Sequence, residues 1–476
     1  MAPCRSSFAA RRHAHARPLV ATLAAALLTA AALAGLAGYR PAPARAATLV
    51  VNVHKYGATG DGRHDDSAAL QRAIARAATH PGSTVYLPAG TYSCPAGVRL
   101  SSGVKLLGAS SATTWLEGHL SFGSHCRIGD LKIGTAGTNA LTNRSGASYT
   151  TFTKCRFRGG GGGTGGAVIV LGSCSGSSRS LSHVTFSHCQ VERNLGVESW
   201  SANGGGGFGY NDISVYEDPS AGGSQVSYLA FVACHIGVSN GAGGHDTGSP
   251  RAGIEVWTGT GKVVKGWHHI TISGCTFEAT DRFCIDLADW PSTSGTHLAG
   301  PALIQGNVIK GAGYGSGDHP WSYSICLEAP RNVRIAHNTI YAAADSTVCG
   351  SYGPASHTVI VYNHIDLTVD NGVQQTGDET VVLKGQDSVF EHNVVRGGTG
   401  CGALLYLKKT TGDRVSGNRF SDARSSGNPA MVKLQDACRN VIVDNVFSTA
   451  AASAPRLLVL GSSAGNTLRP NTFRHG

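Results

Sequence analysis

The sequence is poor in charge. Only 14% of its 476 residues are Asp, Glu, Lys or Arg, which excludes a charge-rich disordered chain. Glycine is abundant instead, with 65 residues, about twice its usual share. This excess weakens helices and suits strands joined by tight turns, where positive φ is needed repeatedly. The composition therefore predicts an all-β protein.

Residues 1–46 lack acidic side chains and hold six of the 39 Lys and Arg residues. Without this segment, 33 basic residues face 29 acidic ones, so the net charge falls from +10 to +4. So small a surplus argues against a nucleic-acid partner.

The same segment is predicted to be a secretion signal peptide. Its basic region ends at Arg17, an apolar stretch covers residues 19–37, and Ala44-Arg45-Ala46 supplies a small-x-small cleavage pattern. The alternative is an uncleaved membrane anchor, since the apolar stretch is long enough to span a bilayer. We expect an exported, extracellular protein that makes no membrane contact after cleavage.

No C-x-x-C pair suggests a metal site. Of the 13 cysteines, Cys4 lies in the predicted signal, which leaves an even twelve. In an oxidising compartment these favour disulfides. The better candidates for bridging are in the later half of the chain, at Cys326, Cys349, Cys401 and Cys438.

A short unit recurs from residue 150 onward, with copies such as VTFSHCQV, VRIAHNTI and VIVDNVF. Each copy carries one polar anchor, and the anchors lie 25 to 45 residues apart, at Cys155, Cys189, Cys234, Cys275, Asn307, Asn338, Asn363, Asn393, Asn418, Asn445 and Asn471. Self-similarity at this period predicts a solenoid, here a parallel β-helix of about ten to thirteen coils stacked about 4.8 Å apart.

The anchors have a physical role in such a helix. An Asn at one corner of every coil can hydrogen-bond backbone groups of its neighbours. The four leading cysteines fit the same inward column as small buried groups, so we expect reduced thiols there, with disulfides as the alternative.

A second strand recurs between the anchors, for example GIEVW, CIDLA and LLYLK. Alignment of the inward Leu and Val residues sets two outward columns by the period of two. The first column reads Val215, Glu255, Asp286, Cys326, Val382, Tyr406 and Lys433. The second reads Glu217, Trp257, Ala288, Glu328, Lys384, Lys408 and Gln435.

The N-terminal part predicts a helix over SAALQRAIARAA, with Asp65 and Asp66 at its start. Leu70, Ala73, Ile74 and Ala77 form one apolar face at helical spacing. Such a helix would cover the open end of the coil stack. We therefore predict a single domain over residues 47–476, with the cap and first coil in residues 47–100.

The segments VNVHKYGATGDGRHDDSAALQRAI (51–74) and GSTVYLPAGTYSC (82–94) resemble the opening of the pectate-lyase-like superfamily, in the version shared by rhamnogalacturonases, polygalacturonases, uronate epimerases and phage tailspikes. The resemblance implies a right-handed parallel β-helix that acts on or binds polysaccharide. The N-T-D, G-H-G and R-I-K motifs of the polygalacturonase-type hydrolases and the D-P-H motif of mannuronan epimerases are absent, so no catalytic residue follows from a motif.

Glu255 and Asp286 occupy one outward column on consecutive coils, which places their Cβ atoms about 5 Å apart. Two such carboxylates need a cation or a shared proton. The pair suits either the acid and nucleophile of a retaining glycosidase, with carboxyls about 5 Å apart, or a Ca²⁺ seat together with Glu217 and Asp289. In a lyase, Glu328 would join this patch and Lys384 would be the candidate base, although a surface salt bridge between them is an equal alternative.

Side chains around these acids suggest a glycan groove. Trp257, Trp290, Trp321 and Tyr323 crowd the same coils, and aromatic faces can stack on sugar rings. The longest insertions flank Glu217 and Glu255 and hold His245 and Arg251, while Lys408 extends the groove. We expect a monomeric secreted enzyme that cleaves polysaccharide, leaning to β-elimination of a uronate-containing glycan. The alternatives are hydrolysis by Glu255 and Asp286, and a non-catalytic glycan-binding or tailspike-like surface protein.

Overall fold

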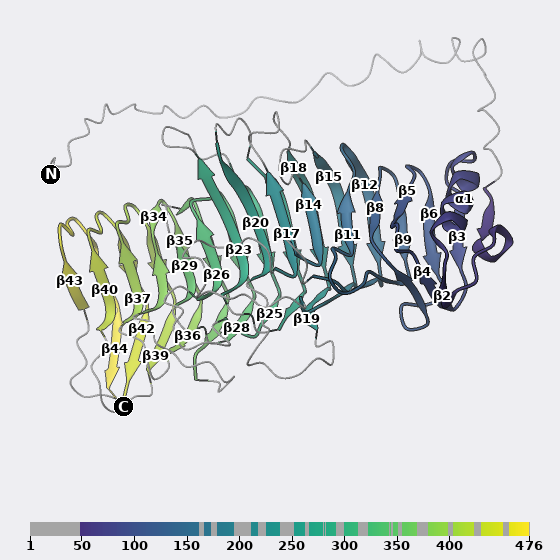
Figure 1. The fold of residues 1–476 in the computed structure, drawn as a ribbon. Coiled ribbons are helices and arrows are strands. Elements are labelled where there is room, and N and C mark those ends of the chain that lie inside the picture. Colours follow the sequence, from purple (N-terminus) through teal and green to yellow (C-terminus); the bar gives the residue numbers. More distant parts are fainter. Residues whose placement is uncertain are drawn as a thin grey trace, which may run out of the picture. The chain divides into compact units, whose positions relative to one another are not determined.

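The computed structural model describes residues 48–160, 166–172, 179–194, 211–217, 225–238, 252–261, 266–278, 280, 282–291, 299–312, 322–341, 343, 346–350, 355–368, 379–397, 403–422, 430–450 and 457–475 (Figure 1). From Thr48 onward these residues belong to one compact unit. The predicted signal peptide lies outside the described residues. Within them, no helix is long and apolar enough to cross a membrane.

Three long sheets make up the described part of the chain. Sheet A has 14 described strands, in the order β1 (Val50–Asn52), β3 (Thr84–Leu87), β6 (Lys105–Gly108), β9 (Arg127–Gly129), β12 (Ala147–Thr153), β15 (Leu181–Ser187), β18 (Val226–Val232), β21 (His268–Ser273), β24 (Ala302–Gln305), β27 (Val333–Ala336), β31 (Val359–Val361), β35 (Val389–Glu391), β38 (Arg414–Ser416) and β41 (Val441–Val443).

Sheet B has 15 described strands, namely β2 (Asp61–Asp65), β4 (Gly90–Ser93), β7 (Thr114–Glu117), β10 (Lys132–Ile133), β13 (Arg156–Phe157), β16 (Gln190–Glu192), β19 (His235–Val238), β22 (Thr276–Phe277), β25 (Val308–Ile309), β28 (Thr339–Tyr341), β32 (His364–Asp366), β36 (Val394–Gly397), β39 (Arg419–Asp422), β42 (Val446–Thr449) and β44 (Thr472–His475).

Sheet C has 13 described strands, namely β5 (Val98–Leu100), β8 (Leu120–Phe122), β11 (Leu141–Asn143), β14 (Ile169–Gly172), β17 (Ile213–Glu217), β20 (Ala252–Gly261), β23 (Phe283–Pro291), β26 (Tyr323–Glu328), β29 (Ser346–Gly350), β33 (Glu379–Leu383), β37 (Ala403–Lys408), β40 (Ala430–Gln435) and β43 (Leu457–Leu460). A small pair, β30 (Ala355–Ser356) and β34 (Gly385–Gln386), lies apart from the three sheets.

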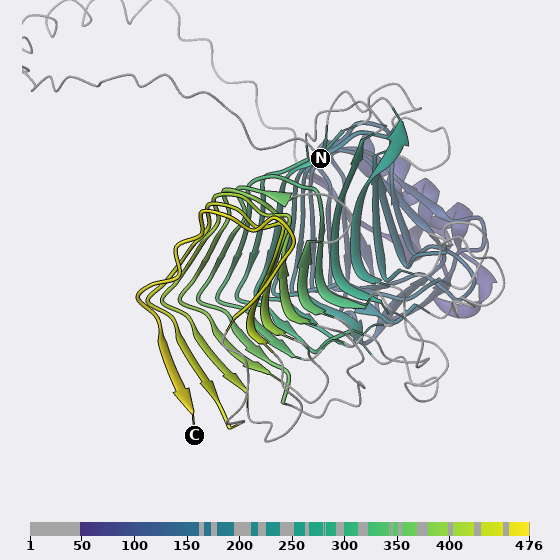
Figure 2. The same cartoon turned by 90° about the vertical axis from the view of Figure 1, so that its left-hand side faces the viewer.

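Each coil visits sheets A, B and C in turn, and the next coil stacks on it in parallel register, for example β12 on β15 and β15 on β18. Figure 2 shows the strands of successive coils lying behind one another around a shared interior. This arrangement confirms the prediction of an all-β, parallel β-helix.

Identical positions of successive coils fill the core. Phe152, Phe186 and Phe231 stack with ring centroids 4.5 and 5.0 Å apart, and all three are buried. The offset between rings equals the strand spacing, because each ring rises with its own strand. Apolar burial along the stack is therefore repeated coil by coil.

The corner between sheets A and B carries the predicted asparagine ladder. The Asn307 backbone N–H donates to Asn338 Oδ1 at 2.9 Å, and Asn307 Nδ2 donates to the Ile272 carbonyl at 3.0 Å. The same two bonds recur through Asn338, Asn363, Asn393, Asn418 and Asn445. Each side chain thus satisfies backbone groups that the tight turn would leave unpaired.

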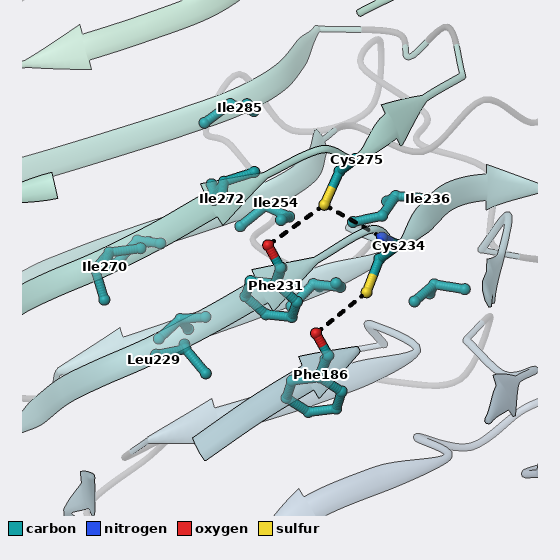
Figure 3. Close-up of a cluster of buried hydrophobic side chains, with 14 of the residues drawn as sticks. Phe186, Leu229, Phe231, Cys234, Ile236, Ile254, Ile270, Ile272, Cys275 and Ile285 are labelled. Atoms are coloured by element: carbon teal, nitrogen blue, oxygen red, sulfur yellow. Dashed lines mark hydrogen bonds between the residues drawn. The ribbon is translucent and has the colours of Figure 1, made fainter. Parts of the chain in front are cut away.

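The four leading cysteines replace asparagine in this column. Cys275 Sγ donates to the Phe231 carbonyl at 3.4 Å, Cys234 Sγ donates to the Phe186 carbonyl at 3.4 Å, and the Cys234 N–H donates to Cys275 Sγ (Figure 3). Cys155, Cys189, Cys234 and Cys275 are all buried free thiols, which confirms that interpretation over disulfides.

The disulfide candidates of the later half are wrong where they are described. Neither Cys326 nor Cys438 forms a disulfide within the described residues. Cys326 faces outward into a packed cluster, and Cys438 Sγ donates to the Ser462 carbonyl at 3.2 Å. Cys401 and the side chain of Cys349 lie outside the described residues. The even number of cysteines misled here, because bridging requires two Cβ atoms aimed at each other.

Helix α1 (Ser67–Ala78) packs against β1, β3, β5 and the short 3-10 helix η1 (Val53–Tyr56), at the purple end of the stack (Figure 1). Leu70, Ala73, Ile74 and Ala77 are its buried face, as predicted. Asp65 accepts the Ser67 N–H at 2.9 Å, whereas Asp66 accepts the N–H groups of Thr59 and Gly60. Both acids have structural roles in the cap.

Candidate functional site

Four neighbouring strands of sheet C, β17, β20, β23 and β26, carry one outward polar row. Ser214 pairs with Glu255, Glu255 with Asp286, and Asp286 with Cys326. The residues that alternate with them, such as Ile254 and Ile285, belong to the core, so the row faces away from it. The structure thus brings Glu255 and Asp286 side by side on adjacent strands.

The predicted columns contain a slip of one residue on β17. Ser214, not Val215, lies beside Glu255, and Tyr216, not Glu217, lies beside Trp257. Val215 is a core residue with no exposed surface. A one-residue shift moves every side chain of a strand to the other face, and backbone pairing rather than apolar similarity decides the register.

The row is shielded although it faces outward. Only 1% of Glu255, 2% of Asp286 and 4% of Glu328 is exposed. Asn211, which is fully buried, donates through Nδ2 to Glu255 Oε2 and to Ser214 Oγ. An amide donor of this kind stabilises a carboxylate and fixes its orientation.

Asp286, Cys326 and Glu328 form a compact three-residue cluster. Each offers one donor atom, and the three atoms lie within 4.8 Å of one another. Cys326 Sγ donates to Glu328 Oε1 at 3.7 Å. The thiol in the middle makes this donor set a poor match for Ca²⁺, which takes oxygen ligands.

Glu217 and Asp289 do not join this cluster. They align with Thr258 in a row three residues beyond that of Glu255 and Asp286. Glu217 accepts the Val226 N–H at 2.6 Å, and Asp289 accepts the Ala299 N–H at 3.0 Å and the Thr258 hydroxyl at 3.2 Å. These carboxyls therefore hold the turn from sheet C to sheet A, and the predicted four-acid calcium seat is wrong in this respect.

Burial, together with a smaller contribution from the charge of Asp289, raises the pKa of Glu217 to about 8 against the opposing effect of the Val226 N–H. Glu217 is thus mostly protonated at neutral pH.

Lys384 lies farther from Glu328 than the sequence predicted. Strand β29 stands between β26 and β33, so two strand spacings, about 10 Å, separate their rows. The repeat of β29 was missed because STVCG has few apolar residues to mark it. Glu328 and Lys384 are therefore not on adjacent strands, as the expected direct salt bridge between them would require.

Basic and aromatic side chains follow on later coils of sheet C. Tyr406 pairs with Lys433, and Lys433 Nζ lies 4.3 Å from the centroid of the Tyr406 ring. Lys408 Nζ lies 5.4 Å from the same ring. These cations lie over an aromatic face, which stabilises their charge.

The aromatic candidates have packing partners. Trp257 is half-buried against Ala167, Val170 and Tyr216. Tyr323 is buried and stacks on Phe283 with centroids 5.9 Å apart. The side chain of Trp290, and all of Trp321, His245 and Arg251, lie outside the described residues.

Sequence reasoning missed Asn211 and Ser214 and assigned Cys326 to a disulfide. The available signal was the polar pair Asn211-Asp212, which directly precedes the strand at residues 213–217. A hydrogen bond from Asn211 to Glu255, 44 residues away, follows only from the stacking of coils.

Comparison with known proteins agrees with this architecture. The model for rhamnogalacturonase A/epimerase, pectate lyase-like proteins matches residues 50–280, and the model for the right-handed β-helix region matches residues 252–431. The chain is a right-handed parallel β-helix that is similar to pectate-lyase-like proteins over residues 50–280.

Two curated relatives from Azotobacter vinelandii match short stretches. Mannuronan C5-epimerase AlgE3 is 41% identical over 73 residues, 14% of this chain and 4% of that protein. Alginate lyase 7 is 45% identical over 56 residues, 12% of this chain and 6% of that protein. The chain thus covers only a small part of their length.

Two solved structures share the fold over most of the chain. The Dettilon tailspike protein has a TM-score of 0.52 at 11% identity, covering 87% of this chain and 68% of that one. The surface adhesin PfbA of Streptococcus pneumoniae has a TM-score of 0.51 at 17% identity, covering 83% and 92%. At such low identity the likeness concerns the fold alone. Together the comparisons show the right-handed parallel β-helix fold.

Proposed function

We propose that this protein is an exported enzyme that cleaves a uronate-containing polysaccharide by β-elimination. The observation that carries the proposal is the outward row on sheet C, where Glu255, Asp286 and Glu328 gather on adjacent coils and Lys384 and Lys408 follow. The short similarity to an alginate lyase and to mannuronan epimerases supports a uronate as the substrate.

β-Elimination removes the proton on the carbon next to the uronate carboxylate, forms a carbon–carbon double bond and expels the glycosidic oxygen. Glu255 and Asp286, which are paired across adjacent strands, would contact and orient the uronate ring. The developing charge on its carboxylate would be stabilised by hydrogen-bond donors of the protein. Lys384 is the candidate base. Glu328 would return a proton to the departing oxygen.

No calcium-dependent step is part of this proposal. The donor set that the coils bring together contains the Cys326 thiol, while Glu217 and Asp289 are engaged by backbone N–H groups. Neutralisation of the uronate is therefore assigned to hydrogen bonds from the protein and to the cations of the later coils.

The test incubates the purified chain with alginate, polygalacturonate and neutral polysaccharides, and records new reducing ends together with the ultraviolet absorbance of unsaturated sugar ends. A rise of both signals on an acidic polysaccharide is expected. Glu255→Gln should abolish both, whereas the matched control Glu278→Gln on sheet B, where Glu278 pairs with Lys310 at 2.9 Å, should not. Reducing ends without unsaturated ends would reject the elimination.

That second outcome is the prediction of the hydrolase alternative. It is favoured by the register of Glu255 and Asp286, since adjacent strands bring two carboxyls to about 5 Å, as in retaining glycosidases. Asp286→Asn would then lose turnover while its substrate still bound.

A non-catalytic surface protein is the candidate from a different class. The fold-level likeness to a tailspike and an adhesin favours it. It predicts neither signal with any polysaccharide, and unchanged glycan binding in Glu255→Gln.

A further inference from the structure

Four consecutive strands of sheet A present an outward face without a charged residue. On β12, β15, β18 and β21 every outward position is Ser, Thr, Tyr, His, Ala or Val. On one side Arg127 of β9 borders this face. On the other side β24 brings the uncharged Leu303 and Gln305, and Arg334 lies one strand further on, on β27. We call these four strands the neutral face.

Hydroxyl groups form rows across the neutral face, because equivalent positions of successive coils stack in register. Half-buried side chains fill two of these rows, and three of the four strands contribute hydroxyls to both, namely those of Thr151, Thr185, Thr271, Thr153, Ser187 and Ser273. Strand β18 contributes Ala230 and Val232 instead. The rows repeat at the strand spacing of about 4.8 Å along the solenoid axis.

An exposed ladder of rings borders the rows. His125, Tyr149, His183, Tyr228 and His269 stack in sequence, with centroids 5.2, 4.5, 4.4 and 4.4 Å apart. Tyr149 is 56% exposed and Tyr228 is 44% exposed. Because the ring faces cover one another, the polar edges are what the ladder presents to solvent.

The backbone at the ladder is strained. All five residues are left-handed, with φ between 51° and 57°. Bulky residues adopt this region at a cost of about 1–2 kcal/mol, which Gly or Asn would avoid. Large rings are therefore kept at positions where the backbone favours small residues, and this points to a role for the ring edges.

We propose that the neutral face binds a neutral, hydroxyl-rich polysaccharide lying along the solenoid axis. A repeating polymer suits the face, because each coil adds one ring edge to the ladder and three of the four coils add hydroxyls to both rows. An anionic glycan does not suit it, since Asp, Glu, Lys and Arg are absent from the outward positions of these four described strands, and charge complementarity is what selects a charged partner. This surface is separate from the acidic row on sheet C and does not depend on the enzymatic proposal.

The test is native affinity electrophoresis at pH 8 in gels that contain xyloglucan, mixed-linkage β-glucan, galactomannan or dextran. We expect retardation by at least one of the four. Tyr149→Asn with Tyr228→Asn, which removes both phenols but suits the left-handed backbone, should weaken that binding at least tenfold. Thr185→Lys, which places a charge within the rows, should do the same without disturbing the rings.

Tyr362→Asn is the matched control. Tyr362 also has φ of 56°, is 53% exposed and stacks between His337 and His392, but lies on later coils outside the neutral face. It should leave the retardation unchanged. The proposal is overturned if none of the four polysaccharides retards the protein, if the neutral-face variants bind like the parent, or if Tyr362→Asn weakens binding equally. Activity on acidic polysaccharide, if present, should survive in all these variants.

Discussion

Two rows of buried polar side chains run along this β-helix, and they differ in how they repeat. At the corner between sheets A and B, the asparagine ladder makes the same two backbone hydrogen bonds on coil after coil. On the outward face of sheet C, Glu255, Asp286 and Glu328 gather on a few coils with partners that differ at each position. Buried polar side chains that repeat on every coil satisfy backbone hydrogen-bonding groups. Buried polar side chains that occur on only a few coils are better candidates for catalytic residues.

The largest expected effect is on enzymatic activity, which should depend on the acidic row of sheet C and not on the asparagine ladder. Glu255→Gln is expected to reduce turnover by about a hundredfold or more, the usual scale for a lost acid or base. Its free energy of unfolding should change little, because the amide retains the shape of the side chain. Turnover and urea denaturation on the same preparation are the measurements, and a variant that keeps its activity would place the chemistry elsewhere.

The next effect should appear in stability. Asn363→Ala removes the acceptor for the Asn338 N–H and the donor to the Ile335 carbonyl, both buried. At about 1–3 kcal/mol for each buried group left unsatisfied, the free energy of unfolding should fall by roughly 3 kcal/mol. Asn471→Ala on the last, partly buried coil is the matched control and should cost less. Equal losses would argue against a burial-dependent ladder.

A pH-dependent effect on stability is expected from Asp413. This acid stands between Ser388 and Asn440 in a second series of hydrogen-bonded side chains. Asp413 accepts the Ser388 N–H at 2.9 Å, and its own N–H donates to Asn440 Oδ1 at 2.8 Å. Burial raises the pKa of Asp413 to about 7, and the charge of Asp387 adds to the shift. The folded state therefore favours the protonated carboxyl more strongly than the unfolded chain does.

Because the folded pKa lies above the unfolded one, this stability is complete at low pH and is lost as pH rises from about 4 to about 7, by at most about 1.4 kcal/mol per pH unit. Asp413→Asn should remove that dependence and be the more stable form at pH 8. Urea denaturation of both proteins from pH 4 to pH 8 tests this, and parallel profiles would contradict it.

The smallest effect should come from the thiol end of the corner column. Cys234→Ala loses the long contacts of the thiol to the Phe186 carbonyl at 3.4 Å and the Val232 carbonyl at 3.5 Å, and a small apolar volume. We expect a loss of about 1 kcal/mol, below that of Asn363→Ala. The midpoints of urea denaturation of Cys234→Ala and Asn363→Ala are compared. A larger loss of stability in Cys234→Ala would show that the thiol stabilises the fold more than the amide does.

Much of this molecule follows from its sequence because the repeat is local. The spacing of Asn307, Asn338 and Asn363 predicted the solenoid, the ladder and its hydrogen bonds, and the apolar face of residues 67–78 predicted the capping helix. The anchor unit recurs eleven times, so each copy supports the interpretation of the others, and the helix pattern is contained within twelve consecutive residues.

Only the tertiary structure decided the site, because register between coils is set by backbone pairing rather than by composition. It placed Ser214 beside Glu255, inserted β29 between Glu328 and Lys384, and turned Glu217 and Asp289 toward backbone N–H groups. It also revealed the exposed ring ladder of sheet A, whose members are 24 to 45 residues apart in the chain and about one strand spacing apart in space. Stacking turns long sequence separations into contacts, and the irregular lengths of the coils hide which residues will meet.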